Sequence, residues 1–159
     1  METTDRATEF VVFCIENTAM RLGISGDILY KEMKRLNAIE EFLYPSYPTL
    51  HTQSKDYIVD EVLTYLKQKT PKFIESVDFW KGENNMVKNP LINETLLQMK
   101  FARVVSLLAK TLQISQVRAL DLFYTSEVYR CLSNLEYHLH NRSDAYIVDE
   151  LILELQAKM

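Results

Sequence analysis

The sequence predicts an all-α protein built from two related small helical bundles that pack into one compact unit. Only three Gly and four Pro occur in 159 residues, which is too few for the many turns of an all-β protein. Apolar residues recur at helical spacing along most of the chain. A twelve-residue stretch at 50–61 occurs again at 139–150 with eight identical positions. Such self-similarity is the sequence signature of a repeated structural unit.

The repeat divides the chain into predicted parts. The spacing between the copies is 90 where residues 112–115 match residues 22–25, and 89 where Leu139 matches Leu50. One residue is therefore missing from the second copy between these two matches. The predicted parts are a first helical repeat at 1–69, a connector at 70–89 and a second helical repeat at 90–159.

The first half is expected to open with a mostly apolar helix from about Ala7 to Leu22, in which polar residues form a single strip. Gly23 can adopt the left-handed conformation that ends a helix. Ser25 can then cap the next helix with its side-chain oxygen. The second copy has Gln113 in place of this glycine, so the two turns could differ.

Two prolines predict an interruption in the middle of the first half. A short helix from Ala38 to Tyr44 is expected to stop before Pro45. Pro45 and Pro48 are expected to bracket a turn, because the residue before a proline is biased away from the helical region. Ser54 can cap the repeated helix that follows, which is expected to run to about Lys67.

The second half repeats this order of helices. Pro71 predicts the start of a short helix in the connector, whose apolar content is too high for a flexible linker. Asn89 and Pro90 predict a helix start, with Asn as the cap and Pro at the first helical position, and this helix is expected to end near Leu112. The caps of the remaining helices are expected at Ser115, Ser126 and Ser143.

Composition argues against several classes of protein. The net charge is −4, and neither half has the basic excess that binding to nucleic acid or an anionic membrane requires.

Cys14 and Cys131 lie in apolar helical contexts without CxxC spacing, so both are expected to be buried, reduced thiols. No segment has the apolar length of a membrane span, and no signal-peptide pattern occurs. We therefore expect a cytoplasmic protein.

No catalytic signature is present. The sequence has no Gly-rich phosphate loop, no G-x-S-x-G and no H-E-x-x-H. His138 and His140 are two residues apart, but a zinc site needs three or four convergent ligands and the first copy has no equivalent of His138. We therefore expect no enzyme, no cofactor and no metal.

The polar identities of the repeat form the candidate site, because a core does not need them. The histidines could simply bond a backbone group at a turn, and the acidic residues could lie on a solvated helix face. The alternative is a partner-binding surface presented twice, to which Tyr44 and Tyr47 would add rings favoured at interfaces. A further interpretation is a small-ligand-binding protein with the two histidines lining twin pockets. The candidate residues are His51, Tyr57, Asp60, Glu61, His140, Tyr146, Asp149 and Glu150.

A DNA-binding regulator is a further alternative. Residues 19–25 and the helix after them resemble a helix-turn-helix, whose second helix enters the major groove. The second copy offers only Arg118 at the corresponding place, beside apolar residues. Two-helix turns are common in helical bundles, so we favour the protein-interaction hypothesis. Under the DNA-binding alternative the contacts would come from Lys31, Lys34 and Arg35.

The residues also resemble a known family. Residues 10–17 (FVVFCIEN) and 50–54 (LHTQS) resemble the small bacterial domain of unknown function 3791. Residues 114–132 and the closing Ser143-x-x-Tyr146-Ile147 resemble the same family in a somewhat different variant, so two tandem copies would cover most of the chain. Members of that family are often encoded beside an ADP-ribosyltransferase-like protein, in arrangements that look like toxin–antitoxin pairs. The resemblance implies an antitoxin or immunity-like partner of such a toxin, and it leaves a homodimer open.

Overall fold

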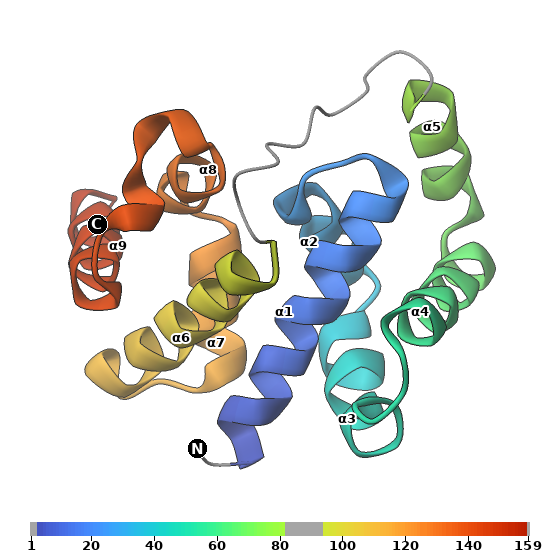
Figure 1. Ribbon diagram of the computed structural model, residues 1–159, viewed down its shortest axis with the longest axis horizontal. Coiled ribbons are helices and arrows are strands. Elements are labelled where there is room, and N and C mark those ends of the chain that lie inside the picture. The colour runs from blue at the N-terminus through green and yellow to red at the C-terminus, as the bar shows by residue number, and fades with distance from the viewer. Residues whose placement is uncertain (1–2, 82–93, 159) are drawn as a thin grey trace. The chain divides into compact units, whose positions relative to one another are not determined.

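A computed structural model describes residues 3–81 and 94–158 of the chain, and its regular elements within these ranges are all helices (Figure 1). The predicted all-α class is confirmed. The chain divides into two units: residues 10–91, which we call the continuous unit, and residues 1–9 with 92–159, which we call the split unit. None of the described helices is long and apolar enough to cross a lipid bilayer.

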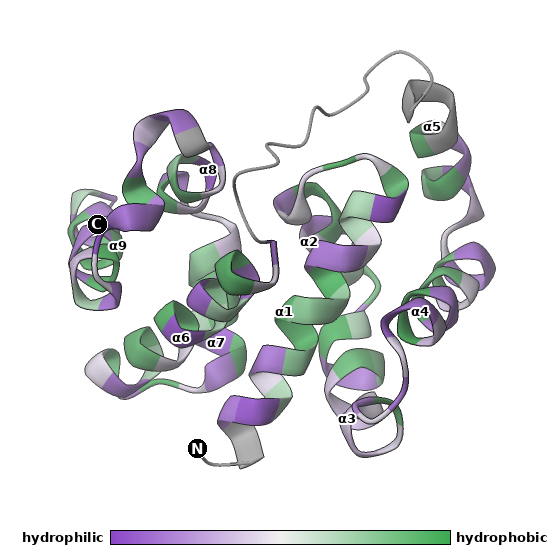
Figure 2. Cartoon of the chain, in the orientation of Figure 1, coloured by the Kyte–Doolittle hydropathy of each residue, from purple (hydrophilic) through white to green (hydrophobic). Residues whose placement is uncertain are grey.

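The first helix contributes to both units. It begins at Thr3, earlier than the predicted Ala7, and its residues 3–9 belong to the split unit. Its first turns are hydrophilic and its middle is hydrophobic (Figure 2). The elements of the continuous unit are the rest of α1 (Thr3–Leu22), α2 (Gly26–Arg35), a π-helix (Ile39–Leu43), α3 (Tyr44–Leu50), α4 (Lys55–Lys69) and α5 (Pro71–Lys81).

Ring contacts join the helices of the continuous unit. Phe10 of α1 meets Tyr47 of α3 edge-on, with ring centroids 5.7 Å apart. Phe42 of the π-helix stacks on Tyr65 of α4 at a centroid distance of 4.0 Å and an interplanar angle of 1°. Burial, together with the charge of Glu41, raises the pKa of Tyr65. The stacked pair of Phe42 and Tyr65 therefore fills the space between the π-helix and α4.

The predicted turn at Pro45 and Pro48 is wrong. Both prolines lie in α3, with Pro45 in its first turn, where a missing N–H needs no partner within the helix. The π-helix before α3 keeps the chain helical, since the N–H of Tyr44 donates to the carbonyl of Ile39, five residues earlier. The two prolines thus lie within α3, which ends at Leu50, and do not open a turn.

The split unit is built around α6, which packs against α7 and α9, while α8 packs against α7 and α9. Four buried rings form its centre, with neighbouring centroids 5.0 to 5.5 Å apart: Phe101, Phe123, Tyr124 and Tyr129. The predicted start at Asn89 and Pro90 lies outside the described residues. The elements of this unit are α6 (Glu94–Leu112), α7 (Gln116–Tyr124), α8 (Glu127–Ser133), 3-10 turns (Leu135–Tyr137 and Leu139–Asn141) and α9 (Asp144–Ala157).

The serine caps are confirmed in four places. At each one the hydroxyl oxygen accepts the backbone N–H three residues later, at 3.0 to 3.2 Å. Ser25 occupies the corresponding position before α2, but its hydroxyl donates to the carboxylate of Asp27 instead of capping the helix. The four confirmed caps are Ser54, Ser115, Ser126 and Ser143.

The turns that follow α1 and α6 have the same geometry. Gly23 and Gln113 are both left-handed, with φ of 75° and 57°. In each turn the next N–H donates to the carbonyl five residues earlier at 3.0 Å, and the left-handed residue donates to the carbonyl three residues earlier. These bonds define the Schellman ending of a helix. The glutamine therefore adopts a conformation that favours glycine.

Replacing Gln113 with Gly is expected to raise the free energy of unfolding by about 0.5–1 kcal/mol. A side chain in the left-handed region costs about 1–2 kcal/mol, and the greater freedom of glycine in the unfolded chain offsets part of this gain. Urea unfolding followed by circular dichroism measures the change. The matched variant Gly23→Gln should have the opposite effect, and a loss of stability in Gln113→Gly would contradict the argument.

Candidate functional site

The repeated motif lies on α4 and α9, and part of it is core. The identical apolar residues of the two helices are at most 3% exposed. They hold each helix against its own unit, which explains their identity without any function. These residues are Ile58 and Val59 on α4, and Ile147 and Val148 on α9.

The identical polar residues lie on the opposite side of each helix. Positions three and four apart share one face of a helix, so Tyr57, Asp60 and Glu61 form one surface of α4, and all three are exposed. We call this surface the outer face of α4. The corresponding outer face of α9 extends one turn further, and its members are Tyr146, Asp149, Glu150 and Leu153.

The two outer faces differ in electrostatics. On α4, Arg21 lies 3.3 Å from Asp60 and 3.4 Å from Asp56, so both carboxylates already have a cationic partner. On α9, neither Asp149 nor Glu150 forms an ion pair within the part of the chain that the structure describes. Two carboxylates on α9 therefore remain available to an external cation.

The two repeated histidines also differ. Nδ1 of His51 lies 2.6 Å from the carbonyl oxygen of Tyr47, and a carbonyl oxygen only accepts, so Nδ1 is the donor. The His51 ring also stacks on that of Tyr47 at 4.4 Å. This is the backbone role expected from the sequence. Nδ1 of His140 is instead buried without a hydrogen-bond partner.

The histidines do not form a metal site. The rings of His138 and His140 lie 6.3 Å apart. Among the described residues, no three His, Cys, Asp or Glu side chains come close enough to hold a metal ion. The different environments of His51 and His140 also give little support to twin ligand pockets.

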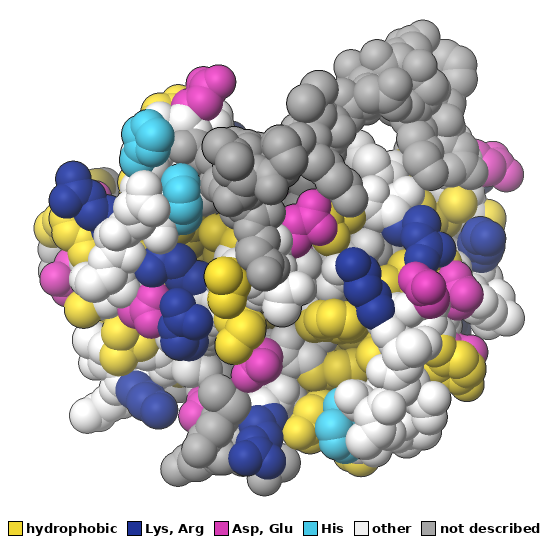
Figure 3. All heavy atoms as spheres, viewed as in Figure 1, with side chains coloured by type: hydrophobic (Ala, Val, Ile, Leu, Met, Phe, Trp, Pro, Cys, Tyr) yellow, Lys and Arg dark blue, Asp and Glu magenta, His cyan; other side chains and the backbone are white. Residues whose placement is uncertain are grey.

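The basic residues of the DNA-binding alternative lie on α2. The guanidinium of Arg35 donates to both carboxylate oxygens of Glu32, at 2.9 and 2.6 Å, and these bonds hold the pKa of Glu32 below its usual range despite burial. Lys31 and Lys34 are exposed. On the face drawn in Figure 3, acidic and basic side chains are interspersed without a large basic surface. These features weaken the DNA-binding alternative.

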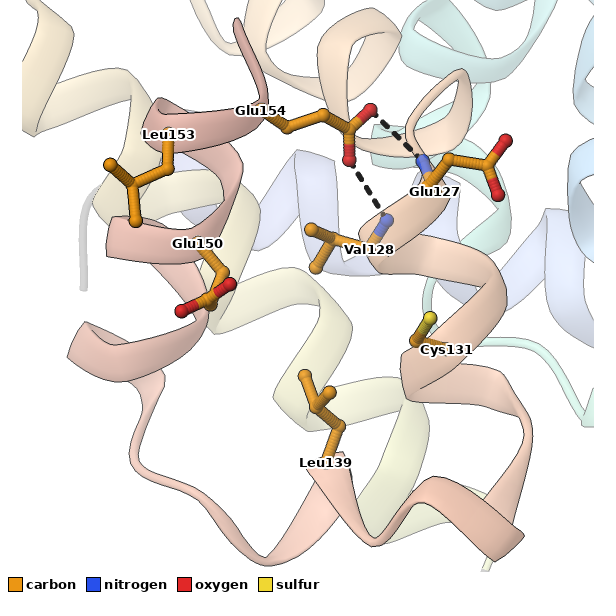
Figure 4. Close-up of a pocket in the computed structure, with 7 residues that line it drawn as sticks. All are labelled: Glu127, Val128, Cys131, Leu139, Glu150, Leu153 and Glu154. Atoms are coloured by element: carbon orange, nitrogen blue, oxygen red, sulfur yellow. Dashed lines mark hydrogen bonds between the residues drawn. The ribbon is translucent and has the colours of Figure 1, made fainter. Parts of the chain in front are cut away.

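A groove of about 360 Å³ lies between α8 and α9 (Figure 4). Its apolar wall is Val128, Cys131, Leu139 and Leu153, and its acidic residues are Glu127, Glu150 and Glu154. The groove adjoins the outer face of α9, because Glu150 and Leu153 belong to both. We call it the α8–α9 groove.

Glu154 fixes one end of this groove. Its carboxylate accepts the backbone N–H of Glu127 at 3.0 Å and of Val128 at 3.1 Å, and it binds Lys158 at 2.7 Å (Figure 4). Burial alone would raise the pKa of Glu154, but these bonds outweigh burial and lower it. Glu154 therefore caps the N-terminus of α8 and holds α8 to α9.

The two cysteines have different surroundings. Cys14 is buried, as expected, and burial raises the pKa of its thiol. Cys131 is only partly buried, and it lines the α8–α9 groove. The prediction of two buried thiols is therefore wrong for Cys131, because its side chain faces the groove.

A second cavity of about 320 Å³ in the split unit has charged walls. Most of its charges are paired, since Lys110 lies 3.6 Å from Asp5 and Arg103 lies 2.8 Å from Asp144, whereas Glu9 forms no ion pair among the described residues. The α8–α9 groove is the better candidate for binding, because it shares Glu150 and Leu153 with the outer face of α9.

Comparison with known proteins adds one match. Residues 9–69 match the family described as "Protein of unknown function (DUF3791)". The predicted family is therefore supported over this range. The DUF3791 match runs from α1 to the end of α4, and it includes the outer face of α4. No curated protein and no solved structure matches the chain.

Proposed function

We propose that this protein is a non-catalytic helical interaction module that binds another protein through the outer face of α9. The observation that carries the proposal is that Asp149 and Glu150, beside exposed apolar side chains, have no ion pair among the described residues. The same motif on α4 is partly neutralised by Arg21. We therefore assign α9 the main contact and α4 a lesser one.

The apolar content of α9 supports this choice. Its inner side is buried through Ile147, Val148 and Leu151, yet Tyr146 is 42% exposed and Leu153 is 57% exposed on the other side. Exposed apolar side chains rimmed by polar ones are typical of a protein-binding surface.

We also propose that residues 94–157 are a second, diverged copy of the DUF3791 domain. The common Schellman turns, the serine caps and the order of helices support this. So does the π-helix at Ile39–Leu43, which lies between the match at a spacing of 90 and the match at a spacing of 89. A π-helical turn accommodates an extra residue within a helix, which accounts for the change.

The proposed partner is an ADP-ribosyltransferase-like toxin, with this protein as its antitoxin. The support is the resemblance to the bacterial DUF3791 family, together with the acidic outer face of α9. A protein that binds a dinucleotide offers a basic cleft for the phosphates. Carboxylates on a rigid helix can cover such a cleft.

The test is co-expression of this protein with the toxin-like product of the neighbouring gene. Asp149→Ala is expected to weaken the complex at least about tenfold, whereas Asp60→Ala should weaken it less because Arg21 already neutralises Asp60. Affinity purification and rescue of growth are the two measurements. Glu75→Ala, at an exposed position of α5, is the control. Absence of a complex, with no rescue, would refute the proposal.

A further inference from the structure

The α8–α9 groove corresponds to a filled space in the other unit. In the continuous unit, Phe42 stacks on Tyr65 between the π-helix and α4. At the spacing of 89, the equivalent residues are Cys131 and Glu154. Both line the groove. Under the proposed duplication, the groove therefore lies at the position that the stacked rings occupy in the continuous unit.

The lining of the groove is apolar inside and acidic around it. Val128 and Leu139 lie at its inner side, and Leu139 projects between the two helices in Figure 4. No Lys or Arg is among the described lining residues, although Arg130 pairs with Glu127 and Lys158 pairs with Glu154. The carboxylate of Glu150 has no partner among the described residues. A ligand that fits must supply an apolar group and a positive charge.

We propose that the α8–α9 groove binds a phenylalanine side chain in a partner segment whose neighbouring residues are Lys or Arg. This proposal rests on the interaction role proposed above, and it specifies the chemistry of the partner. The ring takes the place that Phe42 occupies in the continuous unit. The cationic neighbours pair with Glu150, because Glu127 already has Arg130 at 3.3 Å and Glu154 already has Lys158 at 2.7 Å.

The probe is a short fluorescent peptide with one central Phe flanked on each side by Lys and Arg. One matched peptide has Ala in place of Phe, and another has Glu in place of the cations. Burial of the ring is expected to make the Phe peptide bind about tenfold tighter than the Ala peptide. The acidic peptide should not bind. Fluorescence anisotropy measures all three.

Cys131 provides an independent measurement of occupancy. It lines the groove, whereas Cys14 is fully buried, so a thiol-alkylating reagent should modify Cys131 first. The Phe peptide is expected to slow this alkylation, and the Ala peptide should not. Mass spectrometry of the tryptic fragments distinguishes the two cysteines.

Two substitutions test the assignment within the protein. Cys131→Phe restores the ring found at position 42 and is expected to abolish binding by filling the groove. Glu150→Lys reverses the unpaired charge at the surface and should weaken binding at least about tenfold. Glu75→Lys, at an exposed position of α5 outside both outer faces, is the control and should bind as the unmodified protein does. Circular dichroism checks that each variant is folded.

The outcomes separate this proposal from the proposed function. Equal binding of the Phe and Ala peptides, or no binding of either, overturns the groove proposal. Binding that survives Glu150→Lys does so as well. In each of these cases a toxin complex that depends on Asp149 would leave the proposed function intact. If the Phe peptide binds as expected but no toxin complex forms, the toxin role fails and the groove proposal stands.

Discussion

Replacing Phe123 with Ala is expected to lower the free energy of unfolding by about 3–5 kcal/mol. Phe123 is 0% exposed. Its ring centroid lies 5.4 Å from Phe101, 5.2 Å from Tyr124 and 5.4 Å from Tyr129. Removing the ring leaves a cavity among three rigid neighbours, which cannot collapse fully into the space.

Urea unfolding followed by circular dichroism would measure this loss. Phe123→Leu fills most of the volume and should cost less, about 1.5 kcal/mol or below. Tyr137→Ala, at a residue that is 62% exposed, is the control and should change stability by less than about 0.5 kcal/mol. A small effect of Phe123→Ala would mean that these rings do not form the centre of the split unit.

Replacing Asp144 with Asn is expected to cost about 2–3 kcal/mol. The ammonium of Lys100, whose side chain is 10% exposed, lies 2.9 Å from Asp144 and donates to the carbonyl of Arg142 at 2.6 Å. Arg103 pairs with the other carboxylate oxygen at 2.8 Å. Asparagine removes the charge that compensates the buried ammonium. Partial exposure of Asp144 keeps the cost below that of a fully buried pair.

The stabilisation by Asp144 should also depend on pH. Burial raises its pKa, but hydrogen bonds from Arg103 and Lys100 outweigh burial and hold the pKa below its usual range. A carboxylate whose pKa is lower in the folded state stabilises the fold above the unfolded pKa of about 3.9. That contribution is lost as the pH falls through the lowered pKa.

The measurement is the free energy of unfolding of both proteins between neutral pH and about pH 2. The difference between unmodified protein and Asp144→Asn should be full at neutral pH and should shrink in acid. Asp149→Asn, on the same helix without an ion pair, is the control and should change stability little at any pH. A difference that persists unchanged at low pH would contradict the role of the ion pairs.

Much of the fold could be predicted from sequence because its signals are local. A capping serine acts on an N–H three residues away, so Ser54, Ser115, Ser126 and Ser143 could be read directly. Pro45 and Pro48 misled the prediction because their effect depends on position within a helix. The π-helix that precedes them leaves no strong local signal.

The candidate site could be predicted only in part. The repeated residues indicated the outer faces of α4 and α9. Identical polar residues that the core does not require suggest a binding surface. Arg21, which distinguishes Asp60 from Asp149, comes from another helix. The groove was missed because its signal is a difference between the two halves of the sequence. Alignment of Phe42 and Tyr65 with Cys131 and Glu154 could have revealed it.

The division of α1 between the units affects the order of assembly during synthesis. The continuous unit has all its residues once residue 91 has been made. Residues 3–9 cannot complete their contacts until Gln116 has been made. Asp5 accepts a hydrogen bond at 2.7 Å from Gln116, which lies 111 positions later. Contacts so distant in sequence form slowly, and domains generally fold as units as the chain emerges. Residues 3–9 are therefore made before the continuous unit but reach their final contacts after it.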